Sequence, residues 1–120
     1  MLKKILLVED HDDIRNMMAT YLQLNKYEVI EAENGYDAIQ KALDHKPDII
    51  LMDIAMPVLD GISSTRAMRE NKELEQVPIV CLTAFGDFYR ERAKKAGCND
   101  ILQKPVDFRR LDALLWQHTQ

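Results

Sequence analysis

The sequence is poor in the features that mark secreted or membrane proteins. It contains only two cysteines, Cys81 and Cys98, and these form no CxxC pair. Its apolar runs are short, and the run from Ile5 to Val8 is ended by Glu9 and Asp10 before it reaches the length of a signal-peptide core or a membrane span. We therefore expect a cytoplasmic protein that makes no membrane contact.

Positive charge is also scarce. The chain has 16 Lys and Arg against 20 Asp and Glu, a net charge of −4 and a pI near 5.3. Because binding to a phosphate backbone needs a concentrated basic face, this balance argues against direct nucleic-acid binding. The composition is otherwise that of a globular protein, with 47% apolar and 30% charged residues. The 120 residues are enough for one domain, which we expect to span residues 1–120.

Five short apolar runs rich in branched side chains predict β-strands. None is long enough for a helix, and the first, third and fourth lack polar alternation, which is typical of strands covered on both faces. The runs are Ile5–Val8, Val29–Ile30, Ile49–Met52, Ile79–Leu82 and Ile101–Leu102.

Stretches with helical spacing lie between and after these runs. The first carries an apolar stripe that we expect to face the core, formed by Ile14, Met17, Met18, Tyr21 and Leu22. Similar stripes predict helices around residues 38–43, 62–68 and 108–115. A fourth helix is predicted from Asp87 to Ala96, but its apolar stripe is thin, consisting of Phe88, Ala93 and Ala96. We expect that helix to pack less firmly than the others.

Strand and helix alternate five times along the chain. This order predicts an α/β fold, a doubly wound parallel sheet of five strands with five helices distributed over both faces. In such folds, ligands bind outside the carboxyl ends of the strands. The residues that follow each strand are therefore the candidates for a functional site.

Those positions carry carboxylates, a hydroxyl and an amine. Glu9 and Asp10 follow the first strand, Asp53 ends the third, Thr83 follows the fourth and Lys104 the fifth. Three converging carboxylates repel one another unless a cation neutralises them or some protons are retained. Oxygen ligands without a cage of His or Cys favour Mg²⁺, which leaves coordination positions for a phosphoryl group.

This residue set suits phosphoryl transfer to a carboxylate. An aspartate facing Mg²⁺ can act as a nucleophile toward phosphorus and form an aspartyl phosphate. The charge on the transferred oxygens then needs hydrogen-bond donors, which Lys104, Thr83 and the backbone after Asp53 can supply.

Four segments together resemble the receiver domains of two-component response regulators. They read LVED at 7–10, DIILMDIAMPVLDG at 48–61, PIVCLTA at 78–84 and KP at 104–105. Each alone is weak, but four in order, each next to a predicted strand, are specific, and the resemblance covers essentially the whole chain. It implies a flavodoxin-like strand order, 2-1-3-4-5, and a cis peptide bond before Pro105.

The resemblance also implies roles for individual residues. Asp53 would accept a phosphoryl group from a sensor histidine kinase or a histidine phosphotransfer protein. Mg²⁺ would be held by Glu9, Asp10, Asp53 and the backbone carbonyl of Ala55, while Thr83 and Lys104 would bind the phosphoryl group. Such a domain catalyses only its own phosphorylation and dephosphorylation, and it signals to a downstream protein or output domain. The chain would be either a stand-alone regulator or part of a larger one.

Each candidate also has a simpler explanation. Glu9 and Asp10 could cap the following helix, although Asp12 and Asp13 stand closer to its start. Asp53 could be a buried strand-end residue bonded to a loop. Thr83 and Lys104 would be ordinary strand-end and loop residues if they occurred alone. The loop residue His11 is expected to be solvated, and Asp60 is expected to cap a helix before Gly61.

One position departs from the family. Receivers commonly place Tyr or Phe three residues before the conserved Lys, and here that residue is Ile101. We still expect output through the face formed by the fourth helix, the fifth strand and the last helix, which could also support a homodimer. Without an aromatic ring at Ile101, the gating role could instead fall to Phe85, Phe88 or Tyr89.

Two rival functions share the predicted fold. A phosphatase of the haloacid-dehalogenase type needs a second Asp two residues after its nucleophile, and here that residue is Ala55. A pseudo-receiver would be expected to lack an acidic ligand, the acceptor, the Thr or the Lys, and this chain has them all. A histidine phosphotransfer domain would be a helical bundle instead.

Overall fold

The computed structural model describes residues 2–120, along which strands and helices alternate. The strands are β1 (Lys4–Val8), β2 (Glu28–Ala32), β3 (Ile49–Asp53), β4 (Ile79–Thr83) and β5 (Asp100–Gln103). The α-helices are α1 (Asp12–Leu24), α2 (Gly35–His45), α3 (Gly61–Arg69), α4 (Arg90–Ala96) and α5 (Phe108–Thr119), and two short 3₁₀-helices are η1 (Lys72–Leu74) and η2 (Gly86–Tyr89).

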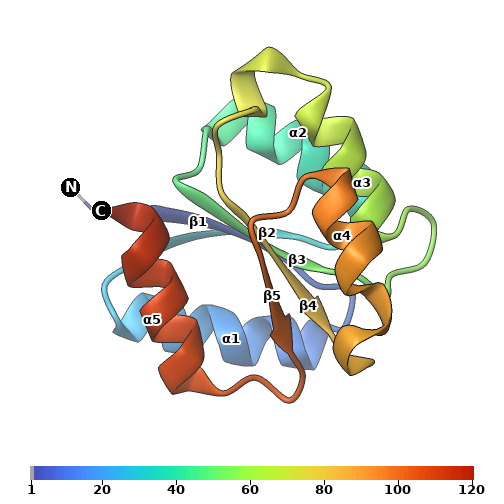
Figure 1. The fold of residues 1–120 in the computed structure, drawn as a ribbon. Coiled ribbons are helices and arrows are strands. Elements are labelled where there is room, and N and C mark those ends of the chain that lie inside the picture. The colour runs from blue at the N-terminus through green and yellow to red at the C-terminus, as the bar shows by residue number, and fades with distance from the viewer. Residues whose placement is uncertain (1) are drawn as a thin grey trace.

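The strands form one parallel sheet in the order β2-β1-β3-β4-β5. Helices α1 and α5 cover one face, and α2, α3 and α4 cover the other (Figure 1). The predicted fold class and strand order are thus confirmed. All five strands run in the same direction, so their carboxyl ends meet at one edge of the sheet.

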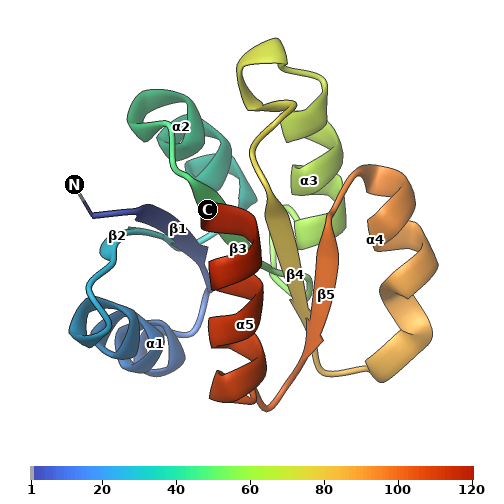
Figure 2. The same ribbon diagram turned by 60° about the vertical axis from the view of Figure 1, so that its left-hand side comes forward.

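The two faces of the sheet build separate apolar cores because side chains alternate along each strand. Ile5 and Leu7 of β1 pack toward α1 and α5, whereas Leu6 and Val8 pack toward the other three helices. Figure 2 shows the two helical layers from a second direction. Strands β3 and β4 are buried along their whole length, which explains their unbroken apolar sequences.

Helix α1 is rotated relative to the sequence prediction. The predicted core residues Met18 and Leu22 are buried, but Ile14 and Met17 are exposed. The buried face instead contains Arg15 and Ala19 together with Met18 and Leu22. This rotation has a polar cause, because the Arg15 side chain turns inward to hydrogen-bond with the β1–α1 loop and β2.

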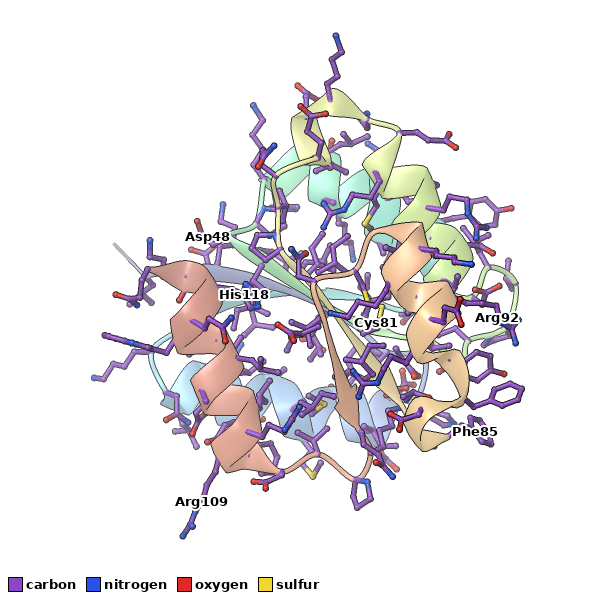
Figure 3. The ribbon with its side chains drawn as sticks, viewed as in Figure 1. Asp48, Cys81, Phe85, Arg92, Arg109 and His118 are labelled. Atoms are coloured by element: carbon purple, nitrogen blue, oxygen red, sulfur yellow. The ribbon has the colours of Figure 1, made fainter. Side chains whose placement is uncertain are left out.

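The predicted helix from Asp87 to Ala96 is in fact two elements, η2 followed by α4. Ala93 and Ala96 are buried as expected, but Phe88 is 68% exposed, so its assignment to the buried stripe was wrong. Gly86, with a φ of 57°, turns the chain out of β4, and the first turn after it is 3₁₀ rather than α. Phe85 and Arg92 project outward at this corner (Figure 3).

Two loop predictions are confirmed. Asp60 is the N-cap of α3, and its Oδ1 accepts a hydrogen bond from the Ser63 backbone N–H at 2.9 Å. The peptide bond between Lys104 and Pro105 is cis.

Within residues 2–120, no helix combines the length and apolar character that a bilayer crossing requires.

Candidate functional site

The carboxyl edge of the sheet brings Asp53, Glu9 and Lys104 into direct contact. Asp53 is the last residue of β3, and its Oδ1 lies 3.1 Å from the Lys104 Nζ. The same Nζ lies 3.0 Å from the Glu9 Oε1. Both carboxylates are buried, so the lysine serves as a shared counter-ion for two negative charges held away from water.

Local sequence explains how Asp53 reaches this position. The apolar residues 49–52 keep β3 fully buried up to its last residue, and the chain then turns back toward α3. Gly61 packs directly on the backbone of Asp53 and Ile54, where a Cβ would collide with the Asp53 carbonyl oxygen. The Gly61 N–H donates to the Ile54 carbonyl at 2.9 Å, which closes the loop that carries the site.

Two oxygens at this edge are buried without a protein donor. Asp10 Oδ1 and Asp53 Oδ2 find no hydrogen-bond partner within residues 2–120. Asp10 Oδ1 lies 3.4 Å from the His11 Nδ1, but without hydrogen-bond geometry. Unsatisfied buried carboxylate oxygens are costly, and a hard cation with oxygen ligands would compensate them. The donor set therefore fits Mg²⁺.

The carboxylates have opposite pKa shifts. Burial and the negative charge of Glu9 raise the pKa of Asp53 to about 6, although Lys104 opposes the shift. Burial also acts to raise the pKa of Glu9, but hydrogen bonds from the His11 backbone N–H and from Lys104 outweigh it and hold this pKa at about 2. Glu9 is thus the carboxylate that stays charged beside Lys104. At Asp53, burial and the charge of Glu9 outweigh the pairing with Lys104 and disfavour the charged form.

Thr83 and Ala55 complete the set of predicted residues. Thr83 ends β4 with a buried side chain, and its Oγ1 accepts a hydrogen bond from the Phe85 backbone N–H at 3.1 Å. Ala55 is exposed on the loop that follows Asp53. The structure brings Glu9, Asp53 and Lys104 into contact and places Asp10, Thr83 and Ala55 on adjoining strand ends and loops.

His11 is more closely connected than the sequence indicated. Its side chain is 64% exposed, as expected for a solvated loop residue, but Nδ1 lies 3.0 Å from the Glu9 Oε2. This hydrogen bond and the charge of Asp10 raise the pKa of His11. Glu9, Asp10 and His11 together offer three ligand atoms within 4.8 Å of one another.

Two further features at this edge were not predicted. One is Arg15, whose Nη1 donates to the Glu9 carbonyl at 2.8 Å; the available signal was a charged residue in phase with the apolar residues Met18, Ala19 and Leu22. The other is a groove of about 490 Å³ beside Lys104, between α1 and the start of α5. Its apolar lining includes Ile14, Met17, Ala84, Pro105, Val106 and Phe108.

Known proteins share this architecture. Residues 5–115 match the family model described as the response regulator receiver domain. The polar-differentiation response regulator DivK of Brucella anthropi is 34% identical over 107 residues, which cover 87% of this chain and 85% of DivK.

Two solved structures are similar over nearly their full length. The chemotaxis protein CheY4 of Vibrio cholerae is 31% identical with a TM-score of 0.92, covering 98% of this chain and 99% of that one. The receiver domain of the sensor histidine kinase PA1611 of Pseudomonas aeruginosa, solved with a magnesium ion coordinated in its active-site cleft, is 36% identical with a TM-score of 0.92, covering 99% and 98%. This chain therefore belongs to the receiver domains of two-component response regulators, a family of signalling domains.

Proposed function

We propose that this receiver domain is a Mg²⁺-dependent phosphorylation switch in which Asp53 is the phosphoacceptor. One observation carries the proposal: Asp53 is buried at the carboxyl edge of the sheet, with Oδ1 paired to Lys104 and Oδ2 without a partner within residues 2–120. Glu9, Asp10, Asp53 and the Ala55 carbonyl would hold the ion. The magnesium site in the similar receiver domain of PA1611 supports this assignment.

The chain's own residues would perform the transfer. A carboxylate oxygen of Asp53 forms the new P–O bond, and the bond from phosphorus to the donor breaks, with its electron pair leaving on the donor. Bound Mg²⁺ supplies positive charge for the carboxylates and the phosphoryl oxygens. Lys104, already held between Glu9 and Asp53, can pair with a phosphoryl oxygen, and the Thr83 hydroxyl can donate to another.

The phosphodonor would be a sensor histidine kinase or a histidine phosphotransfer protein. The groove beside Lys104 supports a protein donor, because its apolar lining extends to Lys104, which contacts Asp53. Ile14 and Met17, which α1 leaves exposed, belong to that lining. A donor that covers this groove would bring its phosphohistidine to Asp53 while excluding water.

Output would use the face formed by α4, β5 and α5. This face carries a groove of about 460 Å³ whose lining includes Arg90, Ile101, Gln103 and Arg110. The groove reaches Lys104. If Lys104 exchanges Asp53 for a phosphoryl oxygen, the change occurs next to the surface that a downstream protein, an output domain or a second copy of this chain would contact. Ile101 is buried beneath it and offers no ring to signal the change.

Acetyl phosphate tests the assignment without a kinase. With Mg²⁺, intact mass spectrometry should detect one added phosphoryl group on the wild-type protein and none on Asp53→Asn. Asp48→Asn is the matched control, because Asp48 lies at the opposite end of β3, where its Oδ2 accepts the Lys4 backbone N–H at 2.7 Å. It should be phosphorylated like wild type. Stoichiometric labelling of Asp53→Asn would show that the acceptor is another residue.

A further inference from the structure

Arg15 is a charged residue on the buried face of α1, with only 8% of its surface exposed. Its guanidinium makes three hydrogen bonds in different directions. Nη1 donates to the Glu9 carbonyl at 2.8 Å, Nη2 to the Asp12 Oδ1 at 2.6 Å and Nε to the Glu31 Oε1 at 3.3 Å. A fourth carboxylate, that of Glu33, lies 3.7 Å from Nη2.

The hydrogen bonds to the carboxylates and the one to the carbonyl have different roles. A buried guanidinium must be paired, and Asp12, Glu31 and Glu33 supply more than enough negative charge for that. The side chains of these three carboxylates are partly or largely exposed. The hydrogen bond to the Glu9 carbonyl is the only one of the three that reaches the functional site, and it is not required to neutralise the arginine.

The Glu9 carbonyl belongs to the peptide unit that joins Glu9 to Asp10. Because a peptide unit is planar, a fixed carbonyl direction also fixes the plane in which the Cα atoms of both residues lie. On its other side, Glu9 is held by its own N–H, which donates to the Ala32 carbonyl of β2 at 3.1 Å. The backbone of Glu9 is thus fastened at both ends, once by the sheet and once by Arg15.

From these contacts we infer that Arg15 is a positioning residue, which sets the Glu9–Asp10 peptide so that both carboxylates face the cation site at once. Glu9 then reaches Lys104, and Asp10 presents an oxygen that accepts no hydrogen bond from the described residues 2–120. The inference rests on the proposed Mg²⁺-dependent function. Residues that orient metal ligands from behind commonly change metal affinity by about 10- to 100-fold when they are mutated.

Arg15 could instead do no more than fasten α1 to β2. The chain offers a comparison in Arg69 of α3, which also donates three hydrogen bonds, to the carbonyls of Gly97 at 2.9 Å and Leu74 at 2.7 Å and to the Asn99 side chain at 2.9 Å. These partners lie in the loops at the opposite, amino-terminal edge of the sheet. Replacing either arginine by Gln removes hydrogen bonds of its guanidinium, but only those of Arg15 include one to a proposed Mg²⁺ ligand, Glu9.

Titration with Mg²⁺ alone, followed by amide NMR shifts, separates the two roles. Arg15→Gln should raise the Mg²⁺ dissociation constant by about 10-fold. Arg69→Gln should lower the melting temperature and leave the dissociation constant at the wild-type value. Equal Mg²⁺ affinity in wild type and Arg15→Gln would overturn the inference, as would an equal loss in both glutamine variants.

A lysine variant covers the case in which Arg15→Gln does not fold. Arg15→Lys keeps the buried charge and its pairing with the carboxylates, but one ammonium group cannot reproduce the arginine fork. We expect its dissociation constant to rise by about 3-fold, less than in the glutamine variant. Wild-type affinity in Arg15→Lys would also contradict a positioning role.

Phosphorylation kinetics distinguish this inference from the function on which it rests. In Arg15→Gln, the rate with acetyl phosphate should reach half its maximum at a higher Mg²⁺ concentration, and its maximum should stay within about 2-fold of wild type, because the reacting groups remain. If wild type itself neither binds Mg²⁺ nor becomes phosphorylated, the proposed function fails. If wild type does both and the variant shows the same Mg²⁺ dependence, only the role of Arg15 fails.

Discussion

The site lies between two corners of the molecule that are built differently. At the β1–α1 corner, the backbone of Glu9 is fixed by Arg15 and by β2, and its carboxylate is fully buried. At the β4–α4 corner, the chain leaves Thr83 through exposed Phe85 into a 3₁₀ turn, and α4 is anchored chiefly by two small residues, Ala93 and Ala96. From this difference we expect the β1–α1 corner, the fixed corner, to hold the ion. We expect the β4–α4 corner, the movable corner, to shift when the acceptor is phosphorylated.

The largest expected effect on stability comes from removing Lys104, the counter-ion that Glu9 and Asp53 share. Lys104→Met leaves the buried Glu9 carboxylate without its amine, and we expect a loss of about 3 to 5 kcal/mol in the free energy of unfolding at pH 7 without Mg²⁺. Urea denaturation measures this loss, and added Mg²⁺ should recover part of it. Lys94→Met is the control, because that lysine donates to the exposed Asn99 carbonyl. Wild-type stability in Lys104→Met would mean that Glu9 is compensated by other groups.

Neutralising Asp53 should increase the free energy of unfolding, whereas removing Lys104 should decrease it. A pKa of about 6 in the folded protein, against 3.8 ordinarily, means that the folded state binds this proton more tightly than the unfolded chain. That contribution is fully present below about pH 3.8 and is lost as the pH rises through 6. Asp53→Asn avoids the loss, and its free energy of unfolding should exceed that of wild type by about 3 kcal/mol at pH 7 without Mg²⁺.

The pH dependence of that difference is the sharper measurement. The two stability curves should nearly coincide near pH 4 and separate as the pH rises toward 7, and Mg²⁺ should narrow the gap by stabilising wild type. Asp48→Asn, at the other end of β3, should show no such gain. A gap that stays constant with pH would show that the gain comes from packing and not from charge.

The sequence predicted the fixed parts of the site better than the surfaces around it. Unbroken apolar runs identify strands that are covered on both faces, and in a parallel sheet their carboxyl ends must converge. The positions of Glu9 and Asp53 could therefore be predicted from the pattern alone. The inward face of α1 could not be predicted in this way, because the rotation of the helix depends on the hydrogen bonds of Arg15 to β2 and the β1–α1 loop. Apolar spacing contains no information about such partners.

The β4–α4 corner was mispredicted for a related reason. A stripe containing Phe88 assumes that the helix begins in α geometry, and the structure starts it with a 3₁₀ turn after Gly86 at positive φ. That change of geometry moves Phe88 out to solvent and leaves the partly buried Tyr89 to pack on the core. The few buried side chains in η2 and α4 agree with the expected weak packing of this corner. That it moves on phosphorylation stays a prediction.

Amide exchange compares the two corners directly. In the free protein, amides of residues 86–96 should open at a free-energy cost about 2 kcal/mol below that of α1, because few buried side chains anchor η2 and α4. Adding Mg²⁺ and beryllofluoride, which mimics an aspartyl phosphate, should change protection from Phe85 to Leu102 and leave α1 nearly unaffected. If the changes stop at the loop after Asp53, the face formed by α4, β5 and α5 is not the output surface.

The smallest expected effect tests how the movable corner is held at its surface. The Arg92 guanidinium lies 5.6 Å from the ring centroid of Phe88 and 5.1 Å from that of Tyr89, and the two rings meet edge to face at 4.8 Å. Cation–π contacts at exposed sites contribute about 0.5 kcal/mol, so Arg92→Gln should speed amide exchange in η2 by about 2-fold.

Global stability should remain within about 0.5 kcal/mol of wild type, because η2 opens locally before the sheet does. Arg109→Gln is the control, since Arg109 projects from α5 on the other side of the molecule (Figure 3) and should leave η2 exchange unchanged. Equal acceleration of exchange in α1 would show that the two corners open together, because a contact confined to η2 and α4 can alter α1 only through a shared opening. In that case the site would have no fixed side, and the ion and the moving helix would respond to phosphorylation as one unit.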